Sequence, residues 1–418
     1  MSAVDPATAA PVTPPAVLRV DVDHGLVPSG LAAELVLAAV RREPWRLLAP
    51  QRLRAAVDGA LPPPDPARLV YDEAVLAALR AAREAGRPLQ LVSRCPRRVV
   101  EIIARHLGIE DADIVAATGA APATLPPGWR GALWRALRPH QWIKNLLLFV
   151  PLVMAHQLGH AGAVLAAGAG FVAFSLTASA VYLLNDLLDL AHDRAHPRKR
   201  WRPLASGALP LRVGALAAPV VLALALAIAL LLPGRFLAVL AVYLAANLAY
   251  TLIIKRAALA DVIVLAGMYT LRVIAGAAAV DVPLSFWLLA FSMFFFFSLA
   301  MVKRHGELRR ATLDPHEKLP GRGYRADDLD TLASFGITSG QLAVLVLALY
   351  INSGAVHGLY AHPKFLWALC PLVLYVVSRA WLVARRGELD DDPLVFVLGD
   401  ARSLAAGALA LVALWLAL

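Results

Sequence analysis

Cysteine and charged residues are both scarce in this sequence. The 418 residues include only two cysteines, Cys95 and Cys370, which lie far apart without the spacing of metal ligands. We therefore expect neither a disulfide framework nor a zinc site. Charged residues make up 17% of the chain and hydrophobic residues 59%, whereas an average soluble protein has about 25% charged residues. The composition excludes an ordinary soluble protein and favours one that spans a membrane.

The scarcity is uneven along the chain. Lysine is absent before Lys144, and no long apolar run precedes it. Residues 1–16 are rich in Ala, Pro and Thr, which is typical of a disordered tail. We predict a small soluble α/β module over residues 17–125 and a mainly α-helical, polytopic transmembrane domain over residues 126–418.

The apolar stretches of the second region predict about nine membrane spans, near residues 144–160, 163–185, 212–232, 236–254, 259–280, 284–302, 334–353, 364–384 and 400–418. Arg and Lys gather in the loops after the second, fourth, sixth and eighth stretches. By the positive-inside rule these loops and the N-terminal module are cytoplasmic, so we expect a multi-pass protein of the cell (inner) membrane. The net charge of +10 follows from this topology, and we expect no nucleic-acid partner.

Three aspartates at the end of the second stretch are the strongest functional signal. Asp186, Asp189 and Asp193 stand at i, i+3 and i+7, which puts their carboxylates on one face if the helix continues through them. Carboxylates that repel one another favour a hard divalent cation such as Mg²⁺, which would bridge them to an anionic ligand. The alternative is a solvated helix end followed by basic residues that obey the positive-inside rule.

Amide and basic side chains surround this aspartate motif. Asn185 precedes Asp189 by four residues and lies beside the same helix face. Lys199 and Arg202 belong to the basic segment directly downstream. A diphosphate needs both a metal and Lys or Arg donors, so the whole stretch predicts a site for such an anion.

Further polar candidates lie around the fifth stretch. Tyr250 and Lys255 close the fourth stretch, and Asp261 opens the fifth. Arg272 lies three turns deeper, where an arginine needs a partner or a polar cavity. The alternatives are a structural ion pair between Arg272 and Asp281, and ordinary snorkelling of Lys255.

Basic residues also stand at two other span ends. Lys144 opens the first stretch, and Arg304 follows the sixth at the start of a long polar loop that has the length of a lid. Either residue could instead be a simple topology signal. The aromatic run Phe294–Phe297 is more typical of a packing or lipid-facing surface than of a ligand site.

The soluble module carries a second aspartate pattern. Asp21 and Asp23 follow a short strand, and Ser93 ends another strand over residues 88–93. These residues resemble the motifs of the haloacid dehalogenase-like phosphohydrolases. The resemblance implies that Asp21 is the nucleophile, Asp23 the acid/base and Ser93 the phosphate-binding hydroxyl.

The module also departs from that family. The family needs a later lysine, and none precedes Lys144. Helices are expected over residues 73–87 and 96–107, and Asp111 and Asp113 follow the second helix directly, where the family has a strand. We therefore predict a shortened, inactive relative with a structural or regulatory role; the alternative is a working phosphatase.

The aspartate motif of the membrane region, followed by the segment Arg202-Pro203-Leu204-Ala205-Ser206-Gly207, resembles the UbiA superfamily of intramembrane prenyltransferases over about residues 133–418. The resemblance implies a helical bundle with a central cavity, Mg²⁺ held by the aspartates and a diphosphate leaving group bound on the metal. The family usually has a second motif, Asp-x-x-x-Asp. Here Asp261 is followed by Leu265 in the second place.

Within the superfamily, residues 137–145, 196–203 and 271–276 resemble the decaprenyl-phosphate phosphoribosyltransferase branch. This implies transfer of 5-phosphoribose from phosphoribosyl diphosphate (PRPP) to a polyprenyl phosphate. Asp186, Asp189 and Asp193 would hold Mg²⁺, and Tyr250 and Lys255 would position phosphate. The substrate-binding candidates are Asn185, Lys144, Lys199, Arg202, Asp261, Arg272 and Arg304.

Two alternatives to this function stay open. One is polyprenyl transfer from a prenyl diphosphate to an aromatic or other acceptor, which the superfamily motif alone supports. The other is a transporter or lipid scaffold, for which the aspartates would be dispensable. The sequence is compatible with a monomer and with a homo-oligomer.

Overall fold

The structure is a computed structural model of the full chain. It describes residues 16–42, 63–117, 125, 127–311, 319, 322–389 and 392–418. They belong to two compact units, which we describe separately: unit 1 is Met1–Leu137 with Tyr182–Ala218, and unit 2 is Arg138–Val181 with Pro219–Leu418. The predicted tail, apart from its last residue, lies outside the described residues. The predicted domain boundary at residue 125 stays a prediction.

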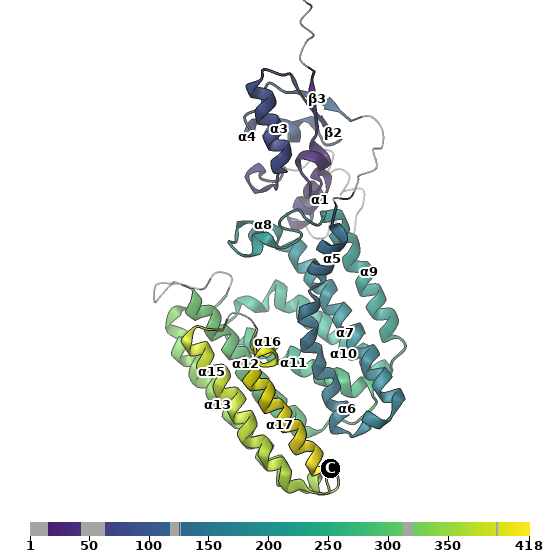
Figure 1. The fold of residues 1–418 in the computed structure, drawn as a ribbon, viewed down its shortest axis with the longest axis vertical. Helices are drawn as coiled ribbons and strands as arrows, with labels where there is room; N and C mark the ends of the chain where they lie inside the picture. The colour runs from purple at the N-terminus through teal and green to yellow at the C-terminus, as the bar shows by residue number, and fades with distance from the viewer. Residues whose placement is uncertain are drawn as a thin grey trace, which may run out of the picture. The chain divides into compact units, whose positions relative to one another are not determined.

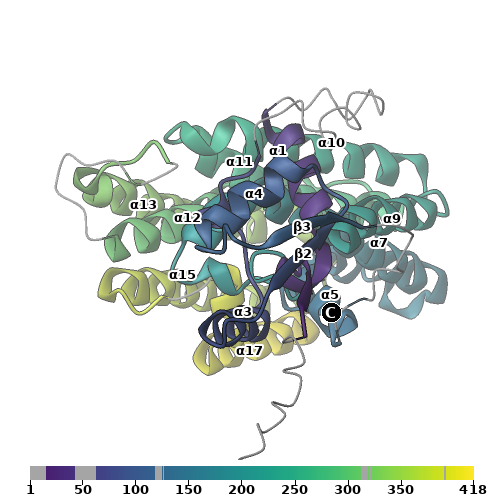
Figure 2. The same ribbon diagram turned by 90° about the horizontal axis from the view of Figure 1, so that it is seen from above.

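Unit 1 contains a three-stranded parallel sheet, which can be followed in Figure 2. β1 (Leu18–Asp21) pairs with β2 (Leu89–Ser93), and β2 pairs with β3 (Asp113–Ala116). Parallel neighbours require crossover connections, which include α3 (Glu73–Glu84) and α4 (Arg97–His106). Both predicted strands and both predicted helices are confirmed within a few residues.

β3 corrects one expectation about the soluble module. The sequence predicts that Asp111 and Asp113 follow the helix over residues 96–107 directly, with no strand there. Instead, Ile114 and Val115 continue the sheet opposite Leu91 and Val92. The reason is physical: β-branched residues favour a strand, and pairing with β2 satisfies their backbone groups.

The sheet shares its core with its own helices. Val20 and Leu91 from the strands pack with Leu79 of α3 and Val100 of α4, and all four are buried. Asp72 caps α3 by accepting hydrogen bonds from the backbone amides of Ala74 and Val75. The module therefore has a hydrophobic core of its own.

Unit 1 also contains a helical layer made of α1 (Leu31–Arg42), α5 (Trp129–Leu137), the end of α7 (Ala161–Leu188), α8 (Leu190–Ala195) and the start of α9 (Leu211–Ala229). Ala33 and Leu37 of α1 pack against a cluster in which Leu187, Leu204 and Leu209 are buried. The soluble module and the chain around the aspartate motif therefore share one hydrophobic cluster.

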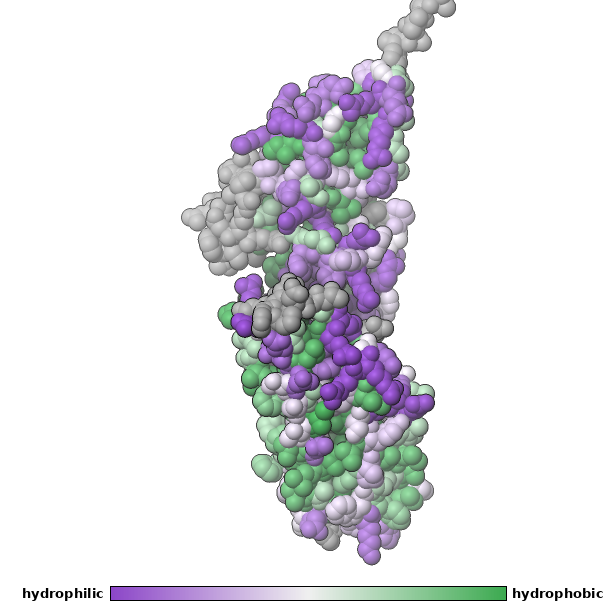
Figure 3. Space-filling view, turned by 90° about the vertical axis from the view of Figure 1, so that its left-hand side faces the viewer, coloured by the Kyte–Doolittle hydropathy of each residue, from purple (hydrophilic) through white to green (hydrophobic). Residues whose placement is uncertain are grey.

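Unit 2 is helical (Figure 1), and its elements are α6 (Val150–Met154), α7 and α9 in part, α10 (Gly234–Leu252), α11 (Ala260–Ala279), α12 (Phe286–Arg310), α13 (Leu329–Ile351), α14 (Gly354–His357), α15 (Leu369–Arg386), α16 (Pro393–Gly399) and α17 (Ala401–Ala417). On the face drawn in Figure 3, hydrophobic residues cover much of the lower half, where the helices of unit 2 lie. Exposed apolar residues such as Leu224, Val242 and Phe286 suit contact with lipid.

The number of membrane spans differs from the predicted nine. Among the described residues, seven helices are long and apolar enough to cross a membrane, or eight if α16 and α17, which meet at a 76° bend, form one span. The predicted span over residues 144–160 is instead the 3₁₀ helix Pro139–Phe149 followed by the short α6. The turn after α6 places His156 at a positive φ of 54°, which ends the helix.

Candidate functional site

The aspartate motif lies where α7 passes into α8. α7 ends at Leu188, and Asp189 stands between the helices with φ −90° and ψ 6°. The backbone N–H of Asp189 still donates to Asn185 (2.8 Å), and that of Asp193 donates to Asp189 (2.9 Å). The i to i−4 pattern therefore continues across the break, as the i, i+3, i+7 spacing requires.

Two of the three carboxylates are deeply buried and share a cation. Asp186 is 3% exposed and Asp193 is 1% exposed. Nη1 of Arg202 donates to Oδ1 of Asp186 at 3.1 Å and to Oδ2 of Asp193 at 2.6 Å. The spacing of the aspartates did not predict this bridge, because Arg202 returns to the motif through a loop.

The oxygen atoms at this site suit a hard divalent cation. Oδ1 of Asn185 is buried and has no hydrogen-bond partner among the described residues. It adds an amide oxygen to the neighbouring carboxylates, and carboxylate and amide oxygens are the ligands that Mg²⁺ prefers. No group of three or more His, Cys, Asp or Glu side chains in the described part of the chain already converges as metal ligands. By donor type the residues present fit Mg²⁺, but in this arrangement Arg202 occupies two of the carboxylates and would have to yield part of its contact.

The basic loop after α8 is ordered by a histidine. Nδ1 of His196 accepts from the backbone N–H groups of Arg198 (3.2 Å) and Lys199 (3.3 Å). Burial lowers the pKa of His196, and the neighbouring Lys199 lowers it further, so the imidazole stays neutral and can accept. Lys199 is half-buried in the 3₁₀ turn Lys199–Trp201, directly before Arg202.

Unit 2 holds a second polar cluster at the start of α11. Asp261 is fully buried, and its Oδ2 accepts from Nε of Arg304 at 2.5 Å. Arg304 also donates to Tyr250 Oη at 2.5 Å and to Glu307. The structure thus brings together three sequence candidates from α10, α11 and α12. Lys255, the fourth candidate of this region, is half-buried in the 3₁₀ turn between α10 and α11.

Residues of the polar loop complete this second cluster. Tyr324 Oη donates to Oδ1 of Asp261 at 2.5 Å, and Nη1 of Arg322 donates to Tyr250 at 2.9 Å. Burial raises the pKa of Tyr324, and its hydrogen bond to Asp261 raises it further. Sequence reasoning gave no role to Glu307, Arg322 or Tyr324, although the last two stand in the loop considered as a lid.

Lys144 belongs to a third cluster in unit 2 that sequence reasoning missed. Oδ2 of Asp392 accepts from Lys144 Nζ at 2.8 Å and from Lys303 Nζ at 3.1 Å, and its Oδ1 accepts from Tyr269 Oη at 2.7 Å. The signal in the sequence is the acidic run that ends at Asp392, immediately before Pro393.

Arg272 is held by neutral groups, and the alternative of an ion pair with Asp281 is not found. Its Nε donates to Oδ1 of Asn145 at 2.8 Å, its Nη1 to the carbonyl of Met268 at 2.6 Å and its Nη2 to Tyr243 Oη at 3.1 Å. The rings of Phe174, Tyr243 and Tyr269 lie 5.1–5.5 Å from its guanidinium carbon. Asp281 pairs with Arg235 instead.

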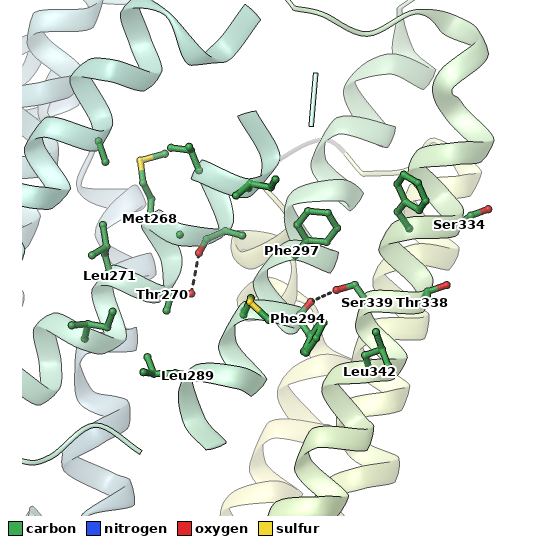
Figure 4. Close-up of a pocket in the computed structure, with 18 residues that line it drawn as sticks. Met268, Thr270, Leu271, Leu289, Phe294, Phe297, Ser334, Thr338, Ser339 and Leu342 are labelled. Atoms are coloured by element: carbon green, nitrogen blue, oxygen red, sulfur yellow. Dashed lines mark hydrogen bonds between the residues drawn. The ribbon is translucent and has the colours of Figure 1, made fainter. Parts of the chain in front are cut away.

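A cavity of about 1240 Å³ lies among α10, α11, α12 and α13 (Figure 4). Its lining is mostly apolar and includes Phe294 and Phe297, so part of the aromatic run lines a cavity and is more than packing surface. The hydroxyls of Thr270 and Ser339 donate to the carbonyls of Ala266 and Phe294, so they do not need a polar ligand. The cavity therefore suits a long apolar group.

Comparison with known proteins defines the class. A bundle of apolar helices with an aspartate motif at one helix end describes a membrane-embedded enzyme, and residues 146–399 match the model of the UbiA prenyltransferase family. The chain therefore belongs to the UbiA prenyltransferase family. It is a transferase of that family and a multi-pass integral membrane protein.

Three curated relatives illustrate the range of similarity. The uncharacterized protein y4nM of Sinorhizobium fredii is 42% identical over 65% of this chain and 53% of its own length. The nodulation protein NoeC of Azorhizobium caulinodans is 38% identical over 64% of this chain and 87% of its own length. A decaprenyl-phosphate phosphoribosyltransferase of Mycolicibacterium smegmatis is 38% identical over 46% of this chain and 62% of its own length. The chain thus spans about half the length of y4nM.

Solved structures agree on the fold. A UbiA homologue from Archaeoglobus fulgidus bound to GPP and Mg²⁺ superposes with a TM-score of 0.52 at 16% identity, covering 68% of this chain and 99% of the homologue. The same homologue bound to DMAPP and Mg²⁺ gives a TM-score of 0.51 at 17% identity. The resemblance of the soluble module to the haloacid dehalogenase-like phosphohydrolases stays a prediction.

Proposed function

We propose that the protein transfers 5-phosphoribose from PRPP to a polyprenyl phosphate, with release of diphosphate. The observation that carries this proposal is the environment of Asp261. Leu265 stands where the second aspartate of the family motif is expected, and Asp261 is engaged by Arg304 and Tyr324. The region offers cations and a tyrosine hydroxyl in place of a second metal site. The 38% identity to decaprenyl-phosphate phosphoribosyltransferases supports the same function.

In this proposal the aspartate motif binds the leaving diphosphate. Asp186, Asp189 and Asp193, with the buried amide oxygen of Asn185, would hold Mg²⁺, which neutralises charge on the departing diphosphate. Arg202 already lies between two of these carboxylates, so it is placed to donate to an oxygen of the same anion. Lys199, in the preceding turn, adds a further donor.

The transfer itself requires the protein to hold three anionic groups. The bond from C1 of ribose to the diphosphate oxygen breaks, with its electron pair leaving on diphosphate, and an oxygen of the lipid phosphate bonds to C1. The lipid phosphate attacks as an anion, so no proton has to be removed first. The 5-phosphate and the lipid phosphate need cations of their own, which a neutral aromatic acceptor would not.

Unit 2 supplies these cations. We assign phosphate positioning to Lys255 and to the Tyr250 hydroxyl, which Arg304 and Arg322 orient by hydrogen bonds. Lys144 and Lys303 share the single carboxylate of Asp392, which leaves one net positive charge there. Arg272 donates to the neutral groups of Asn145 and Tyr243, so its cation is not offset by a carboxylate in these contacts. These are substrate-binding roles.

The apolar cavity suits the polyprenyl chain of the acceptor. Its lining on α11 runs from Ile263, two residues after Asp261, to Ile274. At 1.5 Å per residue this is about 16 Å of helix. A lipid with its phosphate near the polar cluster at Asp261 could therefore lay its first isoprene units along α11.

The experiment is a transfer assay with purified protein, Mg²⁺, labelled PRPP and polyprenyl phosphate. We expect label in the lipid fraction, lost in Asp186→Asn and retained in Asp330→Asn, at an exposed aspartate of α13. Absence of labelled lipid, while a reference phosphoribosyltransferase is active in parallel, would contradict the proposal.

A second candidate function is transfer of a prenyl group from a prenyl diphosphate to another acceptor. The solved homologue bound to GPP and Mg²⁺ or DMAPP and Mg²⁺ favours it. It predicts consumption of a prenyl diphosphate in the same assay without PRPP. The two functions are therefore separated by a single exchange of donor.

For the soluble module we propose a structural role on the cytoplasmic side of the cell (inner) membrane. Asp23, the acid/base of the family resemblance, accepts from Ser93 Oγ and from the backbone N–H of Arg94 (2.8 Å). Asp21 caps the turn that follows β1 by accepting from the amides of Asp23 and His24. Both carboxylates therefore have structural partners. Phosphatase turnover that Asp21→Asn abolishes would overturn this role.

A further inference from the structure

The chain around the aspartate motif is held by a buried ion pair within unit 1. Arg194 follows Asp193 directly, and its Nη2 donates to Oε1 of Glu34 at 2.6 Å while its Nη1 donates to Oε2 at 3.2 Å. The Glu34 side chain is 5% exposed and the Arg194 side chain 10% exposed. The two residues are 160 positions apart in the sequence. A bidentate, buried pair of this kind fixes the orientation of both side chains.

Arg194 also reaches the loop that returns Arg202 to the aspartates. Its Nε donates to the carbonyl of Ala205 at 3.3 Å, three residues after Arg202. Its Nη1 donates to the carbonyl of Arg68 in the soluble module at 3.0 Å. One guanidinium therefore connects α8, the loop over residues 199–207 and the soluble module.

Other contacts place Glu34 and the loop together. Ser29 Oγ donates to Oε1 of Glu34 at 2.6 Å, and the Ser29 carbonyl accepts from the backbone N–H of Leu211 at 3.2 Å. Gly207 adopts a φ of +77°, and a Cβ built on it would lie 3.4 Å from Val70 and 3.5 Å from Pro28. The loop therefore ends against the soluble module at a position that favours glycine.

We propose that Glu34 is a positioning residue for the aspartate motif: it holds Arg194 so that Asp193 and Arg202 keep the geometry needed to bind a metal–diphosphate. This inference rests on the proposed function of that motif. The soluble module then has a structural role that needs no phosphatase chemistry, because its helix α1 carries the Glu34 carboxylate that holds Arg194. The site thus depends on a residue that lies far from it in the sequence.

Removal of the Glu34 carboxylate would leave the Arg194 guanidinium buried without its anionic partner. A buried guanidinium that loses its partner seeks solvent or another anion. Asp193, a carboxylate of the motif, is the residue adjacent to Arg194 in the sequence, so a displaced Arg194 would disturb the backbone that carries the motif. Loss of Glu34 is therefore expected to increase the motion of α8 and of the loop that contains Arg202, and to leave the sheet unchanged.

The test uses the full chain in detergent and inorganic diphosphate with Mg²⁺ as the probe. Glu34→Gln keeps the size of the side chain and removes its charge. Glu101→Gln is the matched control, because Glu101 is an exposed carboxylate of the same module, paired with Arg97 across one helical turn. Calorimetry measures diphosphate affinity, and hydrogen exchange measures the protection of residues 194–207 and of β1–β3.

We expect Glu34→Gln to weaken diphosphate binding about tenfold, which is about 1.4 kcal/mol. Exchange should rise in residues 194–207 while the strands keep their protection, and Glu101→Gln should match the wild type. Exchanging the two charges in one chain (Glu34→Arg with Arg194→Glu) should restore part of the affinity, which a general loss of stability would not allow.

Two results would overturn the inference. One is wild-type affinity and wild-type exchange in Glu34→Gln. The other is equal loss of protection in loop and strands, with no recovery in the charge-exchanged chain. If the wild type itself does not bind Mg²⁺–diphosphate, the proposed function fails, and the exchange data still decide whether Glu34 orders the loop.

Discussion

Arg304 donates from Nε to the carboxylate of Asp261 at 2.5 Å, and both side chains are almost completely buried, at 1% and 0% exposure. They lie on neighbouring helices, α12 and α11. Removing one partner of such a buried pair lowers the free energy of unfolding strongly, because the other charge stays buried without its partner. Replacing both partners by apolar residues of equal size costs much less. The relationship therefore yields a stability prediction.

We predict that Asp261→Ala destabilises unit 2 by about 3–5 kcal/mol, because Arg304 would remain buried without this carboxylate. Asp330→Ala, at a nearly fully exposed aspartate, should change stability by less than about 0.5 kcal/mol. Thermal unfolding in detergent measures both. Equal melting temperatures for the two variants would show that the Asp261–Arg304 pair does not stabilise unit 2.

Arg202 is predicted to compete with the metal for the aspartates. Arg202→Gln removes the cation that bridges Asp186 and Asp193, so Mg²⁺ alone should bind more tightly. Diphosphate in the presence of Mg²⁺ should bind more weakly, because a donor to the anion is lost. Titration calorimetry with each ligand checks the opposite signs. Parallel changes in both affinities would show that Arg202 does not act on metal and anion in different ways.

Two glycines of α11 form a matched pair for packing. A Cβ on Gly276 would overlap the backbone carbonyl of Leu148, whereas a Cβ on Gly267 meets nothing within 4 Å. We expect Gly276→Ala to lower the melting temperature clearly. Gly267→Ala should leave it unchanged or raise stability by up to about 1 kcal/mol through helix propensity. The reverse order would show that α11 and the 3₁₀ helix containing Leu148 are not in close contact.

The cavity predicts where the polyprenyl group of a long acceptor lipid binds. Gly267→Phe adds a ring to the cavity wall on α11, so the KM for a long polyprenyl phosphate should rise several-fold. The KM for PRPP should stay near the wild-type value. Val242→Phe, at an exposed apolar position of α10, serves as the control. An unchanged KM for long acceptors in Gly267→Phe would show that the polyprenyl group of the acceptor does not bind in this cavity.

Cys95 provides a pH prediction for the soluble module. Burial, followed by the negative charge of Asp23, raises the pKa of its thiol to about 12. The thiolate is the reactive form, so only a very small fraction of the thiol is reactive at pH 8. Alkylation of native protein should therefore be slow and should accelerate with rising pH well beyond pH 9. Asp23→Asn should lower the pKa and speed the reaction, and in urea Cys95 should react as an ordinary thiol.

Much of the site chemistry was accessible from local sequence. The i to i−4 hydrogen bonds expected around Asp186, Asp189 and Asp193 are present across the break at Asp189, whereas a shared metal site at the three carboxylates stays a prediction. Tyr250, Asp261 and Arg304 are candidates in the sequence because each is a polar residue near the end of a predicted span. Their direct contact could not be predicted, because it depends on how three helices pack.

The difference from the predicted nine spans shows that hydropathy alone does not predict whether an apolar stretch forms one long helix. The apolar content of residues 144–160 is real, but Pro151 and the turn at His156 prevent a long helix there. β3 was missed for a related reason. Its four residues carry little signal alone and become a strand through their pairing with β2.

By itself, the sequence determined that the protein is a multi-pass membrane protein with an oxygen-rich motif, because hydropathy, charge and helical spacing are properties of neighbouring residues. Only the tertiary structure decided what neutralises that motif and what holds it. Arg202 bridges Asp186 and Asp193 through a returning loop, and Glu34 reaches Arg194 across 160 residues. Such contacts depend on the packing of distant segments, which no local pattern records.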